Sequence, residues 1–228
     1  MKPLVMVYTD HPMCSTDCSD AVCEILNKSG LFKTKTIGPS SYPELKFNDK
    51  NIEKADCIVF PGGWGDSDQF DKDLVNHKLV VKNYVENGGK YLGICMGAYF
   101  AGPHYFDILR GIDVVQYIKR KNSTIRRPTH NIVELIWNNT GEEYNTYFHD
   151  GAAFIPIRRT KNTRIAAKYK NGDAAAIIQK CKRGVVGVIG PHPEAMKWWF
   201  YSQPRITDKW KTCIQHNLFL DFFKTLMI

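Results

Sequence analysis

Three short apolar segments in the first hundred residues run almost unbroken and then end at a turn or a new helix. They are PLVMVYTD (3–10), ADCIVFPGG (55–63) and KYLGIC (90–95). An unbroken apolar strand is typical of a sheet that is buried on both faces. Amphipathic helical patterns at 14–28 and 71–89 separate the three strands. This alternation predicts an α/β fold, in which a parallel sheet lies between two layers of helices.

The second half of the chain changes character. Five short strand-like runs follow one another between turn residues: 131–137, 145–151, 163–170, 173–180 and 184–191. They predict a strand-rich extension that returns to the sheet. An amphipathic helix at 207–227 closes the chain, and its inward face is expected to consist of Trp210, Cys213, Ile214, Leu218, Phe219 and Phe222. Because no linker or repeat interrupts this order, we expect a single domain over 1–228.

Cysteine usage and the amino terminus indicate a compartment. The first residues lack a cleavable signal segment, and no run approaches the roughly 18 apolar residues of a membrane span. The seven cysteines are odd in number and scattered, which favours free thiols and a cytoplasmic protein. Cys14 and Cys18 are spaced as a helical pair, but no second pair matches them, so we expect no metal. The alternative is a thiol near the mouth of a cleft.

A formal net charge of +8 raises the question of nucleic acid. The densest basic runs are KRKNSTIRR (119–127) and RRTKNTR (158–164). Aromatic residues do not interleave them, and no nucleic-acid-binding motif accompanies them. We therefore interpret these runs as solvated surface, and we expect neither a nucleic-acid nor a membrane partner.

Cys95 lies in the segment GICMG, which has the layout of a nucleophile elbow with Cys in place of Ser. A nucleophile on a tight strand-to-helix turn needs neighbours without side chains, and a new helix would favour its thiolate through the helix dipole. The alternative is a buried core cysteine with glycine neighbours. From this spacing alone, both interpretations stay open.

The segment GPHPEA (190–195) follows the last apolar strand and contains a candidate base. His192 could take a proton from a cysteine nucleophile, and Glu194 could orient its imidazole ring. In extended chain, residues two apart point to the same side, so His192 and Glu194 can meet. The alternative is an exposed turn with an idle histidine.

The FPGG turn supplies candidate oxyanion donors at another strand end. The backbone N–H groups of Gly62 and Gly63 could act together with that of Met96. An ordinary glycine turn is the alternative. Strand ends on the carboxyl side are where open α/β sheets build their sites, so these three segments are expected to meet.

In this order, the P-G-G turn, the G-x-C-x-G elbow and the H-P-E motif resemble the class I glutamine amidotransferase-like superfamily. Within it, VYTD, FPGG, GICMGAYFAG and a YFHDGAAF-like segment (147–154) resemble the amino-terminal domain of eukaryotic-type biotin–protein ligases and its stand-alone relatives. The resemblance implies a flavodoxin-like three-layer α/β sandwich with a mostly parallel central sheet. It also implies a triad of Cys95, His192 and Glu194, with His149 and Asp150 lining the site.

One position departs from the pattern of glutamine-hydrolysing members. They carry C-x-G-x-Q, and the place of the glutamine is taken here by Tyr99, which cannot copy a paired amide donor and acceptor. The sequence also lacks a G-R-G-R-like ligase loop, so we expect no biotinylation by this chain alone.

The functional hypothesis is a cysteine-dependent amidase or amidotransferase-like hydrolase acting on a small amide-type substrate, with no cofactor. The alternative is a non-catalytic binding or regulatory module that partners a ligase or synthetase. The aromatic run KWWFYSQP (197–204) is interpreted as core packing, with a partner-binding patch as the alternative.

Overall fold

The computed structural model describes residues 1–9, 15–40, 43–63, 70, 72, 74–158, 160, 162–200 and 212–228. The strands are β1 (Leu4–Tyr8), β2 (Lys33–Gly38), β3 (Leu45–Lys46), β4 (Cys57–Phe60), β5 (Lys90–Ile94), β6 (Ile112–Gln116), β7 (Asn131–Trp137), β8 (Glu143–Phe148), β9 (Ala152–Pro156), β10 (Thr163–Tyr169), β11 (Ala174–Cys181) and β12 (Gly184–Ile189). The α-helices are α1 (Thr16–Lys28), α2 (Asp49–Ile52), α4 (Lys78–Glu86), α5 (Met96–Phe100) and α7 (Thr212–Met227). Short 3₁₀ turns are η1 (Val75–His77), η2 (Tyr117–Lys119) and η3 (Lys197–Phe200).

One sheet runs through the described chain in the order β3-β2-β1-β4-β5-β12-β11-β10-β7-β8. From β3 to β12 every neighbouring pair is parallel, and beyond β12 every pair is antiparallel. The pair β6 and β9 branches off, and β9 also pairs with β11. β12 therefore brings the end of the second half into the parallel sheet, directly beside β5.

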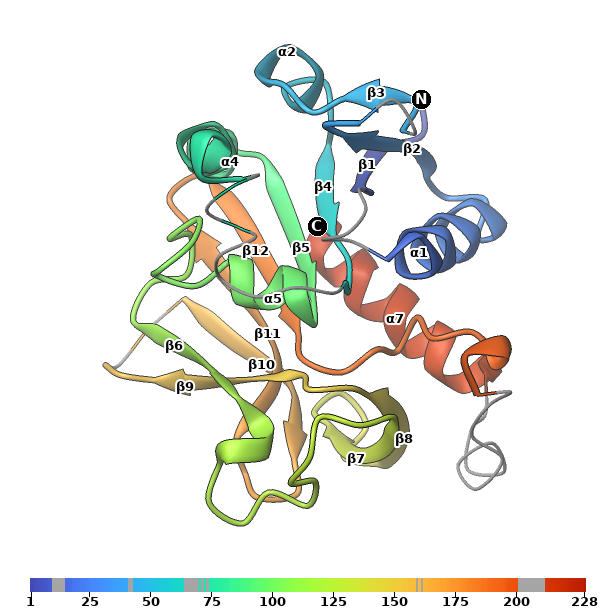
Figure 1. Cartoon of the computed structure of the whole chain (residues 1–228), viewed down its shortest axis with the longest axis vertical. Helices are drawn as coiled ribbons and strands as arrows, with labels where there is room; N and C mark the ends of the chain where they lie inside the picture. The colour runs from blue at the N-terminus through green and yellow to red at the C-terminus, as the bar shows by residue number, and fades with distance from the viewer. Residues whose placement is uncertain are drawn as a thin grey trace.

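Helices cover both faces of the parallel strands, as Figure 1 shows. In β1, Val5 and Val7 pack with the apolar residues of α1 and α7, whereas Met6 and Tyr8 pack with those of α2, α4 and α5. This alternation follows from the period of two in a strand, and it explains why β1 is apolar throughout. The predicted α/β three-layer sandwich with a parallel centre is confirmed.

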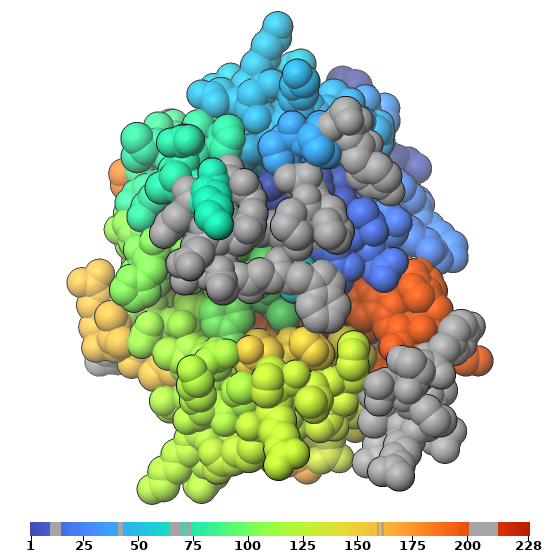
Figure 2. All heavy atoms as spheres, viewed as in Figure 1, coloured from blue at the N-terminus to red at the C-terminus, as the bar shows by residue number. Residues whose placement is uncertain are grey.

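Within the second half, β12 joins the parallel strands and the other strands extend the sheet away from them. In Figure 1 the segments from β6 to β10 lie below the parallel strands, and Figure 2 shows the same green-to-yellow segments forming the lower part of this face. All five strand-like runs predicted there contain a strand, with ends shifted by a few residues. β6, β9, β3 and α2 were not predicted, because each is short and lacks a clear period of its own.

Two helices differ from the prediction in detail. The described part of the helix expected at 71–89 contains η1 and α4 rather than one continuous helix. Val81 and Val85 form the buried face of α4, whereas Leu79 is 69% exposed. In α7, Leu218, Phe219 and Phe222 are buried as predicted, but Ile214 is 38% exposed. Trp210 and the side chain of Cys213 lie outside the described residues.

Within the described residues, no helix has the length and apolar character that crossing a membrane requires.

Candidate active site

Cys95 lies on a tight turn between β5 and α5. Its φ is 50° and its ψ is −105°, a backbone conformation that side chains other than glycine rarely adopt. The flanking glycines leave room for this turn. A Cβ on Gly93 would lie 2.3 Å from the carbonyl oxygen of Gly97, and one on Gly97 would lie 1.8 Å from that of Phe60. The backbone strain and the two close approaches together give this turn the geometry of a nucleophile elbow.

Two backbone N–H groups near Cys95 have no acceptor among the described residues. The Cys95 carbonyl oxygen accepts from the N–H groups of Ala98 and Tyr99, which leaves the Met96 N–H at the free start of α5. The Gly63 N–H also has no acceptor among the described residues. Gly63 and Cys95 line the same cavity. These are the donors that an oxyanion would need.

His192 and Glu194 come from the segment that follows β12, the strand next to β5. Ile189 pairs with Ile94, and the Cys95 N–H donates to the Ile189 carbonyl oxygen at 2.9 Å, so the two strand ends are level. The His192 N–H donates to the Tyr147 carbonyl oxygen at 2.8 Å, which anchors this segment on β8. His192 Nδ1 lies 2.8 Å from Glu194 Oε1, and both side chains are buried. The contact expected from their spacing is present.

Burial alone would lower the pKa of His192, because it penalises the charged imidazolium. The interactions of His192 with Cys95 and Glu194, which include the hydrogen bond to the Glu194 carboxylate, outweigh burial, and the pKa of His192 rises to about 10. The imidazole of His192 therefore interacts with both the Cys95 thiol and the Glu194 carboxylate. This is the order that a cysteine, histidine and acid triad requires.

Gly62 forms one wall behind His192. A Cβ on Gly62 would lie 2.4 Å from His192 Cε1 and 3.1 Å from Cys18 Sγ. The first glycine of the FPGG turn is thus needed for space beside the imidazole ring. Of the two glycines, only Gly63 is among the described residues that line the cavity.

A cavity of about 210 Å³ opens beside Cys95 and His192. Its described lining consists of Ser15, Asp17, Cys18, Gly63, Cys95, His130, Tyr147, His149, His192, Trp198 and Trp199. Cys18 is therefore a second thiol at the cleft, while Cys14 lies outside the described residues. The described residues contain no group of three or more His, Cys, Asp and Glu arranged to hold a metal.

The sequence did not single out His130, Tyr147, Ser15 or Asp17. His130 Nδ1 and the Tyr147 hydroxyl form a hydrogen bond, and the His130 ring lies 4.9 Å from that of His149. His130 precedes β7 and Tyr147 lies in β8, so their meeting depends on the register of an antiparallel pair. From the run 197–204, interpreted as core packing, Phe200 is buried and Trp199 packs against the core, while Trp198 and Trp199 also line the cavity.

His149, Asp150 and Tyr99 lie beside the elbow in different ways. The Cys95 thiol donates to the His149 carbonyl oxygen at 3.6 Å, and burial lowers the pKa of the His149 imidazole. The Tyr99 hydroxyl donates to the Asp150 carbonyl oxygen at 3.1 Å, and Gln116 donates to the Asp150 carboxylate at 2.7 Å. Neither Tyr99 nor Asp150 is among the described lining residues of the cavity.

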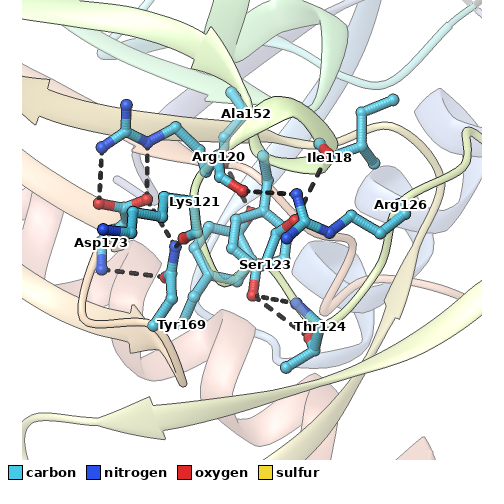
Figure 3. A network of polar contacts seen from close by, with 11 residues as sticks. Ile118, Arg120, Lys121, Ser123, Thr124, Arg126, Ala152, Tyr169 and Asp173 are labelled. Carbon is cyan, nitrogen blue, oxygen red and sulfur yellow. Dashed lines mark hydrogen bonds and ion pairs between the residues drawn. The ribbon is translucent and has the colours of Figure 1, made fainter.

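The second half of the chain braces the strand end that precedes His192. The buried Tyr169 hydroxyl donates to the Ala152 carbonyl oxygen at 2.7 Å, and a Cβ on Gly190 would lie 1.9 Å from that same oxygen. Nearby, the Arg120 guanidinium donates twice to the Asp173 carboxylate across the turn that follows β10 (Figure 3). The antiparallel strands thus hold the backbone that presents His192.

A larger cavity, of about 720 Å³, lies at the opposite ends of the parallel strands. Pro3 and Lys90 line it at the starts of β1 and β5, and its described lining contains no Cys or His. Sites in open parallel sheets form at the carboxyl ends of the strands, where the Cys95 cavity lies. The smaller cavity is therefore the candidate active site.

A family model for the amino-terminal region of biotin–protein ligase ("Biotin-protein ligase, N terminal") matches residues 4–116. The biotin–protein ligase of Schizosaccharomyces pombe is 26% identical over 161 residues, which cover 60% of this chain and 25% of the ligase. An uncharacterized protein of Chlamydia muridarum is 27% identical over 168 residues, which cover 62% of this chain and 61% of that protein. The chain thus matches less than two thirds of the length of either relative.

Solved structures show the same fold. A protein assigned as a GMP synthase component from Thermoplasma acidophilum superposes with a TM-score of 0.61 at 16% identity, over 97% of this chain and 93% of that one. A glutamine amidotransferase superposes with a TM-score of 0.60 at 16% identity, over 96% and 97%. A chain of PurLQS from Thermotoga maritima gives 0.59 at 18% identity, over 85% and 89%. At these identities the likeness establishes the fold alone.

Proposed function

This chain has the class I glutamine amidotransferase-like fold and, over residues 4–116, matches the amino-terminal family of biotin–protein ligases; on that basis we propose that it is a cysteine-dependent hydrolase of a small C–N bonded substrate. The reaction class is that of an amidase or of the ammonia-releasing half of an amidotransferase. Cys95 is the nucleophile, His192 the base and Glu194 the residue that orients His192.

One observation carries the proposal. Cys95 has the strained backbone of an elbow and opens onto a cavity, while the buried His192–Glu194 pair reaches the same thiol from the neighbouring strand. A core cysteine needs neither the strain nor a charged partner, and both cost free energy. The strained backbone and the charged pair lie at the ends of two neighbouring strands, and this coincidence supports a catalytic use of Cys95.

The proposed reaction has two halves. The Cys95 thiolate attacks the substrate carbonyl carbon, a C–S bond forms, and the carbonyl electron pair moves to oxygen, where the Gly63 and Met96 N–H groups stabilise it. The protonated His192 then gives its proton to the leaving nitrogen as the C–N bond breaks. Water, deprotonated by His192, cleaves the resulting thioester and releases the acid and the thiol.

Alkylation by iodoacetamide tests the activated thiol. We expect Cys95 to react at neutral pH at least about tenfold faster than a free thiol with an ordinary pKa. The tryptic peptide 91–110 contains Cys95 as its only cysteine, so mass spectrometry can follow this site alone. Reaction no faster than that of the free thiol contradicts the proposal.

Turnover is tested with a panel of small amides, by measuring the release of ammonia or amine. Cys95→Ala should abolish release, whereas Cys181→Ala, at a buried thiol on β11, should leave it intact. Release that survives in Cys95→Ala contradicts the assignment of the nucleophile.

A second candidate function is a non-catalytic module that partners a ligase or synthetase. It is favoured by Tyr99, whose hydroxyl is already bonded to the Asp150 carbonyl oxygen at the position where glutamine-hydrolysing members carry Gln. It is also favoured by the match to one quarter of a biotin–protein ligase. Turnover of any amide by the isolated chain would exclude this candidate. Co-purification with a ligase that persists in Cys95→Ala, together with no turnover, would support it.

The proposal also covers the cellular location and the domain organisation of the chain. Five described cysteines, Cys18, Cys23, Cys57, Cys95 and Cys181, are free thiols, which supports a reducing, cytoplasmic location. The sheet is continuous from β3 to β8, which supports one domain over 1–228. Limited proteolysis that releases two stable halves would contradict the single domain.

A further inference from the structure

The candidate active site differs in charge from the rest of the chain. The chain has a formal net charge of +8, with 31 Lys and Arg residues. Among the described residues that line the Cys95 cavity, none is Lys or Arg, and Asp17 is the single acid. Asp17 lies in the first turn of α1, where its carboxylate offsets the positive end of the helix dipole. A substrate carboxylate therefore has no guanidinium or ammonium partner among the described lining residues.

Aromatic residues also line this cavity. The rings of Tyr147 and Trp199 lie 5.4 Å apart at an interplanar angle of 75°, and the rings of His192 and Trp199 lie 5.6 Å apart. Trp198, 40% exposed, also lines the cavity. Indole and phenol faces attract cations through the ring quadrupole.

The histidines do not reverse this picture. Burial and the neighbouring His130 and His192 lower the pKa of His149, which disfavours a positive charge on its imidazole. The positive charge of a protonated His192 is paired with the Glu194 carboxylate, 2.8 Å from Nδ1. The described walls of the cavity thus contain one acid and several aromatic rings, and the buried His192 is already paired with Glu194.

From these walls we propose that the substrate carries a positive charge at the end away from the scissile C–N bond. The inference rests on the proposed function and narrows it to small amides, or related C–N compounds, with an ammonium or quaternary ammonium group. That group lies against Trp198, Trp199 and Tyr147 and near the Asp17 carboxylate. Free glutamine, which carries a carboxylate as well as an ammonium group, is a poor match.

A pair of charged alkylating reagents tests the inference without turnover. The probes are iodoacetamides that carry either a trimethylammonium or a sulfonate group on the same ethyl linker. In each case the Cys95 sulfur displaces iodide and forms a thioether. We expect the cationic reagent to alkylate Cys95 about fivefold or more faster than the anionic one, after division by the rates with a free thiol. Equal rates, or a faster anionic reagent, overturn the inference.

Variants locate the preference. Asp17→Asn and Trp198→Leu should each reduce the rate ratio by about twofold or more. Asp20→Asn is the matched control, because Asp20 is an exposed acid on the same helix that does not line the cavity. If Asp20→Asn reduces the ratio as strongly as Asp17→Asn, the preference comes from the general field of the protein and the inference is wrong.

This experiment separates the two proposals. The ratio of the charged reagents can be measured whatever the absolute reactivity of Cys95. A fast reaction of Cys95 with neutral iodoacetamide but no cationic preference overturns the charge class alone. A slow reaction with the neutral reagent contradicts the activated nucleophile, even if the cationic preference is found.

Discussion

His192 Nδ1 and Glu194 Oε1 lie 2.8 Å apart and are both buried, with one proline between the two residues in the chain. The carboxylate fixes which ring nitrogen faces it, so the other nitrogen is directed toward Cys95. Burying a charge costs free energy unless the charge is paired. His192 and Glu194 form such a pair beside the thiol of Cys95, which lines a cavity. The geometry of these two residues thus leads to the first predictions.

Glu194→Gln should lower the pKa of His192 from about 10 by at least about one unit, because the negative charge of Glu194 is one cause of the raised value. The amide preserves size and can still accept a hydrogen bond. The titration of the His192 ring, followed by NMR, measures the change. A midpoint that stays near 10 would show that Glu194 does not stabilise the imidazolium.

The same pair makes stability depend on pH. The folded-state pKa of His192 lies near 10, above the value of about 6.5 in an unfolded chain. Protonation of His192 therefore stabilises the fold fully below about pH 6.5, and this contribution is lost as the pH rises toward 10. We expect the free energy of unfolding in urea to fall between pH 7 and 10 by a few kcal/mol more in the wild type than in His192→Gln. Parallel curves for the two proteins would contradict the raised pKa.

Gly62→Ala should displace the imidazole ring, because the new Cβ would lie 2.4 Å from His192 Cε1. We expect a destabilisation of about 1–3 kcal/mol and alkylation of Cys95 that is slower by about tenfold. Gly172→Ala is the control: its φ of 90° makes alanine unfavourable, but nothing lies within 4 Å of the new Cβ. It should lose stability and keep Cys95 reactivity. If both variants keep full reactivity, Gly62 does not position His192.

The sequence predicted those parts of the site that depend on local geometry. Glycines on both sides of Cys95 indicate a turn without space for Cβ atoms, and the spacing of His192 and Glu194 places them on one side of an extended segment. The order of apolar strands and helices predicted the parallel sheet. In each case, the residues that determine the feature lie within a few positions of one another.

The rest of the site depends on contacts between distant segments. His130 meets Tyr147 only because β7 and β8 pair in one register, and Asp17 and Trp198, far apart in the chain, line the same cavity. The pair β6 and β9 was missed for the same reason, since IDVVQ (112–116) becomes a strand through its partner. A single sequence contains no local signal for such pairings.

The strain at Cys95 leads to a last prediction, which needs no substrate. Alanine normally stabilises a folded protein relative to glycine, because glycine loses more backbone entropy on folding. At φ 50° and ψ −105° this order should reverse, since glycine adopts such a conformation without a steric penalty. We therefore expect Cys95→Gly to be more stable than Cys95→Ala by about 1 kcal/mol in urea unfolding. Cys57, a buried cysteine in β4 that lacks a positive φ, is the matched position, and there Gly should be less stable than Ala. If alanine is more stable than glycine at both positions, the elbow relaxes when the thiol is removed. A reversal at Cys95 alone would mean that the fold holds this backbone under strain whatever the side chain, as expected of a turn whose use is to present a nucleophile.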